Sequence, residues 1–243
     1  MIGQVRSELL KQRSTQTAVF LFLAMVGLVA LAVAMHVLAL SKTRLATNAH
    51  QLDVFQIGTR AGMLFAALAG ALAITAEIRY GTIRPTFLVQ PKRSPVLAAK
   101  LTVGALTGFV YGLLAEGLMA AFAAIAFSLR GIPNELTGSD YLRILLGGAS
   151  AAALWAMLGV GIGALVRNQV ATLVGLCAWM FLVESVSEGF VPGAAKLMPG
   201  STGLSLAGNE HNLSIAIAAS LLVGYTAAAA TAGWVTTLRR DVT

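Results

Sequence analysis

The 243-residue chain has few charged residues, since Lys, Arg, Asp and Glu together make up 11% of it, and aromatic residues only 7%. Hydrophobic residues reach 57%, well above their share in ordinary soluble domains. So few charges exclude a soluble globular domain, which needs a charged exterior. The composition predicts an all-α polytopic membrane protein.

Cysteine is also scarce. The single cysteine, Cys177, lies within an apolar run and has no intrachain partner for a disulfide. We interpret it as a packing residue. The net charge of +7 does not require a nucleic-acid partner, because basic residues that flank apolar runs are typical of membrane topology.

Motifs of nucleotide and metal chemistry are missing from the sequence. It has no G-x-x-x-x-G-K-[ST] loop, H-E-x-x-H helix or G-x-S-x-G turn. The three histidines, His36, His50 and His211, are far apart along the chain. We therefore expect no catalytic residue, no metal site and no cofactor bound by this chain itself.

Long apolar runs predict six transmembrane helices. The expected spans are 18–40, 54–76, 95–129, 144–166, 170–183 and 213–238. The first 17 residues predict an amphipathic helix on the membrane surface, with Ile2, Val5, Leu9 and Leu10 on one face and Glu8 among the polar residues elsewhere. Gly and Pro repeatedly break 184–212, which predicts external re-entrant half-helices between spans five and six.

Basic residues indicate how such a chain lies in the membrane. Six spans place both termini, the loop after span two and the turn after span four on one side. That side holds 11 of the 17 Lys and Arg residues, and the other side holds 6. The positive-inside rule makes the richer side cytoplasmic, so we expect a multi-pass protein of a bacterial plasma membrane with both termini inside.

The loop at 77–94 concentrates charge between two apolar runs. Thr82 is a suitable helix cap, Ile83, Phe87 and Leu88 share one helical face, and Pro91 ends the pattern. A short amphipathic helix joined to two spans is the expectation. From charge and spacing alone, a basic lipid-facing anchor is equally compatible.

The residues of this loop resemble a known signature. E-x-R-x-G-T-I-x-P-T, followed by P-K-R and A-A-K, is similar to the loop of ABC-2 type transporter permeases, and the whole chain resembles their layout. Val89 and Gln90 stand where family members often have a Leu-Leu pair.

This resemblance implies that the loop docks onto a separate ATP-binding subunit, which would bind the ATP and Mg. It also implies a second permease copy, with a homodimer expected. The coupling residues that it implies are Glu77, Arg79, Gly81, Thr82, Arg84, Phe87, Pro91, Arg93 and Lys100.

The third span carries a regular row of residues. Lys100, Gly104, Gly108, Gly112 and Glu116 follow one another at intervals of four. The glycines predict a ridge that a neighbouring helix approaches closely. Glu116, about 24 Å along the axis from Lys100, is an ionisable residue deep in a span and a candidate for either helix packing or a translocation path.

Two further functions remain open. The alternative to an ATP-driven exporter of a hydrophobic or amphipathic substrate (a drug, lipid, peptide or natural product) is a proton-coupled secondary transporter using Glu116. A lipid-anchoring scaffold also fits the span count. The sequence selects no substrate among these classes.

Overall fold

The structure of the protein is a computed structural model that describes residues 2–83, 85, 93–208 and 213–239. These residues form helices and no strand. Six helical segments are long and apolar enough to cross a membrane: α2 (Gln16–Ala39), α4 (Asn48–Arg79), α6 (Arg93–Arg130), α7 (Gly138–Val166), the run Gln169–Phe190 and α12 (Ile215–Arg239). The predictions of an all-α chain and of six helices long and apolar enough to span a membrane are confirmed.

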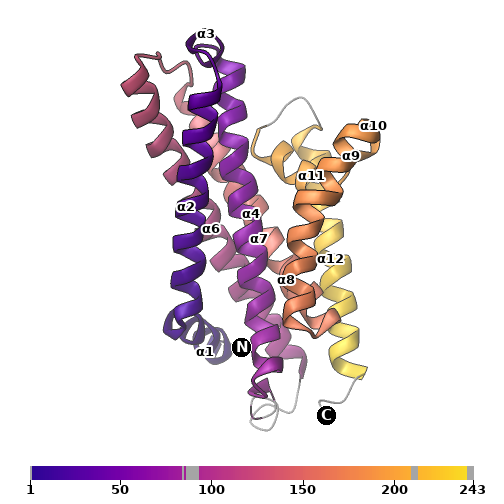
Figure 1. Cartoon of the computed structure of the whole chain (residues 1–243). Helices are drawn as coiled ribbons and strands as arrows, with labels where there is room; N and C mark the ends of the chain where they lie inside the picture. Colours follow the sequence, from indigo (N-terminus) through magenta and orange to yellow (C-terminus); the bar gives the residue numbers. More distant parts are fainter. Residues whose placement is uncertain (1, 84, 86–92, 209–212, 240–243) are drawn as a thin grey trace.

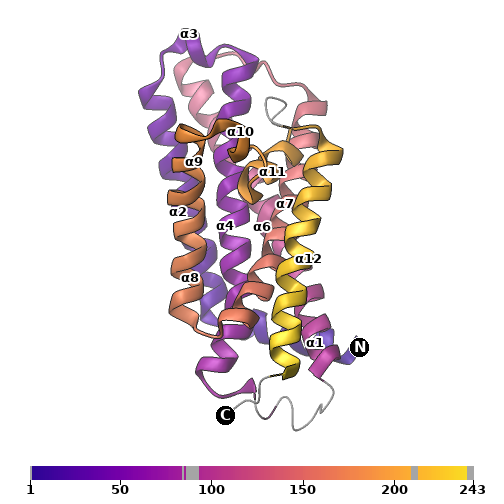
Figure 2. The same ribbon diagram turned by 90° about the vertical axis from the view of Figure 1, so that its right-hand side faces the viewer.

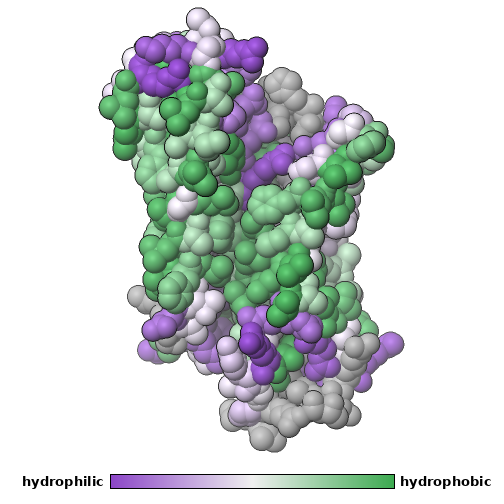
Figure 3. Space-filling model, viewed as in Figure 1, coloured by the Kyte–Doolittle hydropathy of each residue, from purple (hydrophilic) through white to green (hydrophobic). Residues whose placement is uncertain are grey.

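The six spans lie side by side in one bundle (Figure 1). At one end, here called the basal end, α1 (Ile2–Ser14) packs against α6, and α12 ends at the same end of the bundle. At the opposite, distal end lie α3 (Lys42–Leu45) and α10 (Pro192–Ala195) (Figure 2). On the face shown in Figure 3, hydrophobic residues cover the middle, and hydrophilic residues gather toward both ends.

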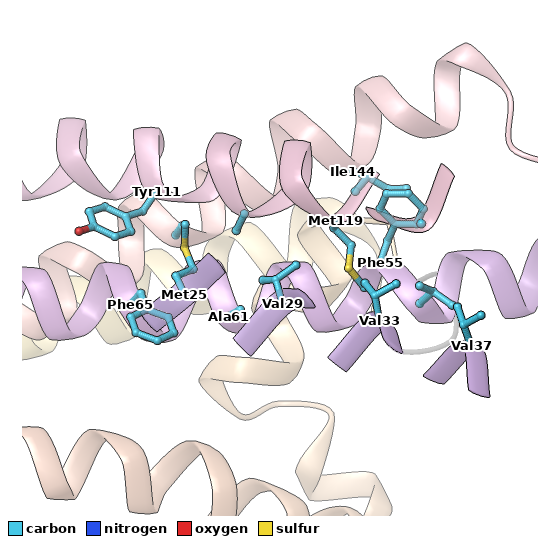
Figure 4. Close-up of a cluster of buried hydrophobic side chains, with 14 of the residues drawn as sticks. Met25, Val29, Val33, Val37, Phe55, Ala61, Phe65, Tyr111, Met119 and Ile144 are labelled. Atoms are coloured by element: carbon cyan, nitrogen blue, oxygen red, sulfur yellow. The ribbon is translucent and has the colours of Figure 1, made fainter. Parts of the chain in front are cut away.

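The helices α4 and α7 form the centre of the bundle. Both are buried along most of their length, whereas α2 and α12 bury only a narrow stripe. On α2 this stripe is Met25, Val29, Val33 and Val37, at the four-residue spacing that keeps side chains on one helical face. The stripe packs into a cluster with residues of α4, α6 and α7 (Figure 4).

Local capping sets the turn between α7 and α8 (Gln169–Ala178). Arg167 ends α7 in the left-handed conformation with φ 58°, and the Asn168 side chain accepts a hydrogen bond from Ala171 N at 3.0 Å to begin α8. The turn therefore occupies the 167–169 stretch, where the sequence predicts a very tight connection.

The fifth span is longer than the sequence predicts. After α8 it continues through the π-helical turn η1 (Trp179–Glu184) and α9 (Ser185–Phe190), instead of ending at Val183. Glu184 does not end the helix, because its carboxylate accepts hydrogen bonds from Trp179 Nε1 at 2.9 Å and Gly200 N at 2.7 Å. The broken segment thus begins at Val191, and it contains α10 and α11 (Pro199–Leu206).

The helix α11 is short and lies inside the bundle, where it packs against α4, α7 and α12. All eight of its residues are buried. Its hydroxyl groups are satisfied locally, since Thr202 and Ser205 donate to the backbone oxygens of Pro199 and Ser201. A buried helix with such a polar sequence depends on its neighbours for its position.

Candidate functional site

The basal end of α4 carries the first residues of the 77–94 loop. Arg79 is exposed, lies 5.6 Å from the centre of the Tyr80 ring and donates to Gln169 at 3.4 Å. Gly81 is exposed with φ +72°, a conformation that favours glycine, and a Cβ there would meet nothing within 4 Å. Thr82 donates to the Glu77 backbone oxygen at 3.5 Å.

The other expected coupling residues fall into two groups. Arg84, Phe87 and Pro91 lie outside the described residues, as does the short helix predicted there. Arg93 begins α6 and donates to the Thr237 backbone oxygen at 2.8 Å, which joins α6 to the last turns of α12.

Lys100 and Glu77 belong to a buried cluster of charges at the basal end. Lys100 Nζ lies 2.8 Å from Glu8 Oε2 and 3.0 Å from Glu77 Oε1, and Lys11 Nζ lies 2.8 Å from both Glu8 Oε1 and Glu77 Oε1. Lys100 also donates to the Ala73 backbone oxygen at 2.8 Å. We call Glu8, Lys11, Glu77 and Lys100 the basal charge cluster. It ties together α1, α4 and α6.

Most of the side chains in the basal charge cluster are shielded from solvent. The Lys100 side chain is only 1% exposed, and those of Glu8 and Glu77 are 8% and 13% exposed, whereas that of Lys11 is 42% exposed. Two carboxylates and two ammonium groups balance, so the cluster has no net formal charge. Lys100 and Glu77 are therefore largely covered, while Arg79, Gly81 and Thr82 are exposed at the basal end.

The cluster shifts the pKa values of its α1 members. Burial raises the pKa of Glu8, but the charges and hydrogen bonds of Lys100 and Lys11 outweigh burial and hold it below the usual 4.5. Burial lowers the pKa of Lys11, but hydrogen bonds and charges of Glu77 and Glu8 raise it above the usual 10.5. Both groups are therefore charged at neutral pH.

A cavity of about 550 Å³ opens beside the basal charge cluster, between α1, α2 and α4. Its polar wall includes Glu8, Lys11 and Glu77, and its apolar wall includes Leu21 and Leu72. Oε2 of Glu77 is buried and accepts no hydrogen bond from the described residues. The volume is within the range of small-molecule sites, and its two walls suit a molecule with one polar and one apolar end.

The glycine row of the third span faces α7. At Gly108 a Cβ would lie 2.6 Å from the Ala152 backbone oxygen, and at Gly112 a Cβ would lie 2.5 Å from Ala149 Cα. At Gly104 the nearest atom would be Val160 Cγ2 at 3.2 Å. The glycines thus lie at the contact between α6 and α7, where the backbones approach most closely at Gly108 and Gly112.

Glu116 lies at the end of this row, between α4 and α7. Its side chain is 1% exposed, and Thr59 Oγ1 donates to its Oε1 at 2.5 Å. The space for the carboxyl group is made by two glycines, since a Cβ would lie 2.9 Å from Oε2 at Gly58 and 2.6 Å from Oε1 at Gly148. Oε2 accepts no hydrogen bond from the described part of the chain.

Sequence reasoning missed two of the polar residues that organise the bundle. Glu8 was expected on the polar face of a surface helix, but it is buried against Lys100, while Leu10 is 59% exposed. Glu184 is the first residue of the 184–212 segment that was expected to be external, but its side chain is buried, where its carboxylate accepts a hydrogen bond from Gly200 N of α11. The available signal for Glu8 was Lys100, a lone cation in an apolar run that needs a partner.

The fold and these sites define a multi-pass membrane protein. No model of a known protein family matches its sequence. No curated protein matches it significantly either.

Proposed function

We propose that this chain is the transmembrane permease subunit of an ATP-driven exporter of the ABC-2 type, and that it moves a hydrophobic or amphipathic substrate out across a bacterial plasma membrane. It works with a second permease copy and a separate ATP-binding subunit, which supplies the ATP and Mg chemistry. The basal end, with both termini, lies in the cytoplasm. The excess of Lys and Arg at this end supports that orientation.

The observation that carries this proposal is the basal charge cluster, which contains Glu77, the first residue of the 77–94 loop. A permease driven by a separate motor must pass movement of a docked loop to its membrane helices. Glu77, two residues before Arg79 on the same helix, is held by both Lys100 of α6 and Lys11 of α1. A push on the loop therefore moves three helices together.

The cavity of about 550 Å³ beside the basal charge cluster offers a binding place for the substrate. Its apolar wall accepts the hydrocarbon part of an amphipathic molecule, and its polar wall accepts the head. In this orientation the cavity lies at the inner face of the membrane, where an exporter takes up its load.

Two finer features belong to the same proposal. The helix α1 lies on the membrane surface, with exposed Leu10 in contact with lipid. The segment after Phe190 enters the bundle from the distal side and turns back, so that α11 forms a re-entrant half-helix. Its complete burial and its connection to Glu184 support this arrangement.

The test is recovery of an ATP-binding subunit with the tagged chain, followed by transport measurement. Gly81→Glu is expected to abolish recovery and ATP-dependent transport, because it places a bulky acidic side chain on the exposed loop. Gly131→Glu is the matched control. Gly131 has φ +62°, is exposed and has nothing within 4 Å of a Cβ, but it lies at the distal end.

Two results would contradict the proposal. One is a chain that is purified without any ATP-binding subunit and transports without ATP. The other is a Gly81→Glu variant that retains the ATPase subunit and transports at the wild-type rate, which would leave the loop as a basic membrane anchor.

A second function, proton-coupled secondary transport, is favoured by one observation. Glu116 is a carboxyl group buried in a span without an ion-pair partner among the described residues. Transport into vesicles separates the two functions. Dependence on a proton gradient without ATP supports the second one, and dependence on ATP without a gradient supports the exporter.

A further inference from the structure

We propose that Glu116 is a proton-exchange site reached from the distal end through a partly polar cavity between α4, α7 and α11. The ligand is a proton, which binds the carboxylate and leaves it again. This inference does not rest on the exporter proposal, because a proton site can serve a transporter with either source of energy.

The distal cavity has a volume of about 270 Å³. Its polar lining includes Asp53 and Gln56 of α4 and Asp140 and Arg143 of α7. A water molecule occupies about 30 Å³, and polar walls are the condition for water to stay, so the cavity has room for several ordered waters.

Thr59 connects this cavity to Glu116. It lines the cavity and also donates its hydroxyl group to Glu116 Oε1 at 2.5 Å. A hydroxyl group both donates and accepts hydrogen bonds, so Thr59 is able to bond the carboxyl group with or without its proton. It is therefore suited to pass a proton between the cavity water and Glu116.

The surroundings of Glu116 favour the bound proton. An unpaired carboxylate in a span is costly, and binding a proton removes this cost. Oε2 has no hydrogen-bond partner among the described residues, whereas a purely structural polar group usually has its acceptors satisfied. Glu116 thus receives the proton at Oε1, the oxygen that Thr59 joins to the cavity, while Oε2 accepts no hydrogen bond from the described residues that would stabilise a negative charge.

The other charged groups of α6 and the neighbouring Arg60 of α4 lie at a distance from Glu116 or belong to other pairs. On α6 itself, Lys100 and Arg130 are about 24 and 21 Å along the axis. Arg60 of α4 pairs with Glu188 at 2.9 Å. The helix α2 contains His36 but no Asp, Glu, Lys or Arg, and α11 contains no titratable group.

The cavity charges are therefore the ones that bias Glu116. Asp53 and Asp140 attract protons toward the cavity, and Arg143, also lining it, opposes this effect.

The first measurement is the infrared band of protonated carboxylic acids in the full-length protein in lipid bilayers. At neutral pH we expect a band in the wild type that Glu116→Gln removes and Glu184→Gln retains. If Glu116→Gln fails to fold, Thr59→Val gives the same assignment, because loss of the hydrogen bond moves the Glu116 band to higher frequency. The proposal is overturned if the wild-type protein lacks this band, or if neither Glu116→Gln nor Thr59→Val changes it.

The second measurement is the shift of that band on transfer to D₂O, which reports proton exchange. We expect the wild type to shift within the mixing time and Leu52→Trp to shift at least tenfold more slowly, because Leu52 lines the cavity. Leu142→Trp is the control, since Leu142 is 59% exposed on α7. A band that never shifts is a sealed structural acid, and equal rates in all three proteins exclude the distal route. Either result overturns the proposal.

Discussion

Glu8 and Lys100 lie 92 positions apart in the sequence and form an ion pair of 2.8 Å in the interior of the basal end. The pair joins a helix outside the spans to the longest helix of the bundle. Because Lys100 is also bonded to Glu77, the same ammonium group connects α1 to α4. One buried cation therefore links three helices at the basal end.

Replacing this cation gives the first prediction. Lys100→Met leaves Glu8 and Glu77 with less compensation in a buried site, and breaking a buried pair in this way costs about 3–5 kcal/mol. We expect a clear fall in the thermal unfolding temperature of the purified protein. Lys42→Met, at an exposed position of α3, should unfold like the wild type.

A double variant separates charge from packing at this site. The double variant Glu8→Gln with Lys100→Met should lose less stability than the two single variants lose together. Each single variant leaves the other charge of the pair without its partner, whereas the double variant removes both charges. Simple additivity of the unfolding free energies would show that the two residues do not interact.

The docking of α1 should depend on pH with a defined sign. Because the pKa of Glu8 lies below 4.5 in the folded protein, its contribution is present above pH 4.5 and is lost as the pH falls through the lowered value. The pKa of Lys11 lies above 10.5, so its contribution is present below pH 10.5 and is lost as the pH rises through the raised value. The helix α1 stays docked between these limits.

A spin label at exposed Ser7 would measure this docking, with Cys177 replaced by Ser to avoid a second label. We expect the label to gain mobility in acid and in strong base. Glu8→Gln should make the label mobile already at neutral pH. A label whose mobility is unchanged from acid to neutral pH would contradict the role of Glu8.

The contact between α6 and α7 gives a prediction about packing. Gly108→Ala adds a methyl group 2.6 Å from the Ala152 backbone oxygen, so the helices must move apart at a cost of about 1–3 kcal/mol. The unfolding temperature should fall accordingly. Gly117→Ala is the matched control on the same helix, because nothing lies within 4 Å of a Cβ there, and it should be neutral or slightly stabilising.

The position of α11 should depend on Glu184. Glu184→Leu removes the acceptor of Gly200 N and Trp179 Nε1 and leaves the buried Gly200 N without its partner, which costs about 1–3 kcal/mol for an unsatisfied buried donor. Hydrogen exchange of residues 199–206 should become faster. Glu188→Gln removes only a partly exposed pair with Arg60 and should leave this exchange unchanged. Equal protection in both variants would show that α11 is held by packing alone.

Apolar composition and run length by themselves determined the class of fold. A bilayer requires helices of about 20 apolar residues, so the runs beginning at Ala18, Pro95 and Leu213 could be assigned to spans without knowledge of their neighbours. Capping was also local. The turn at Arg167 and Asn168 could be predicted because its hydrogen bonds join residues only a few positions apart.

The tertiary structure alone decided where the charges lie. A hydropathy pattern assigns Glu8 and Glu184 to polar surfaces, because it contains no information about a partner distant in sequence. Lys100 is the partner of Glu8, and Gly200 N is the partner of Glu184. These contacts offset the free-energy cost of burying each carboxylate. The distal cavity next to Glu116 is of the same kind, since its walls come from three helices that only the folded bundle brings together.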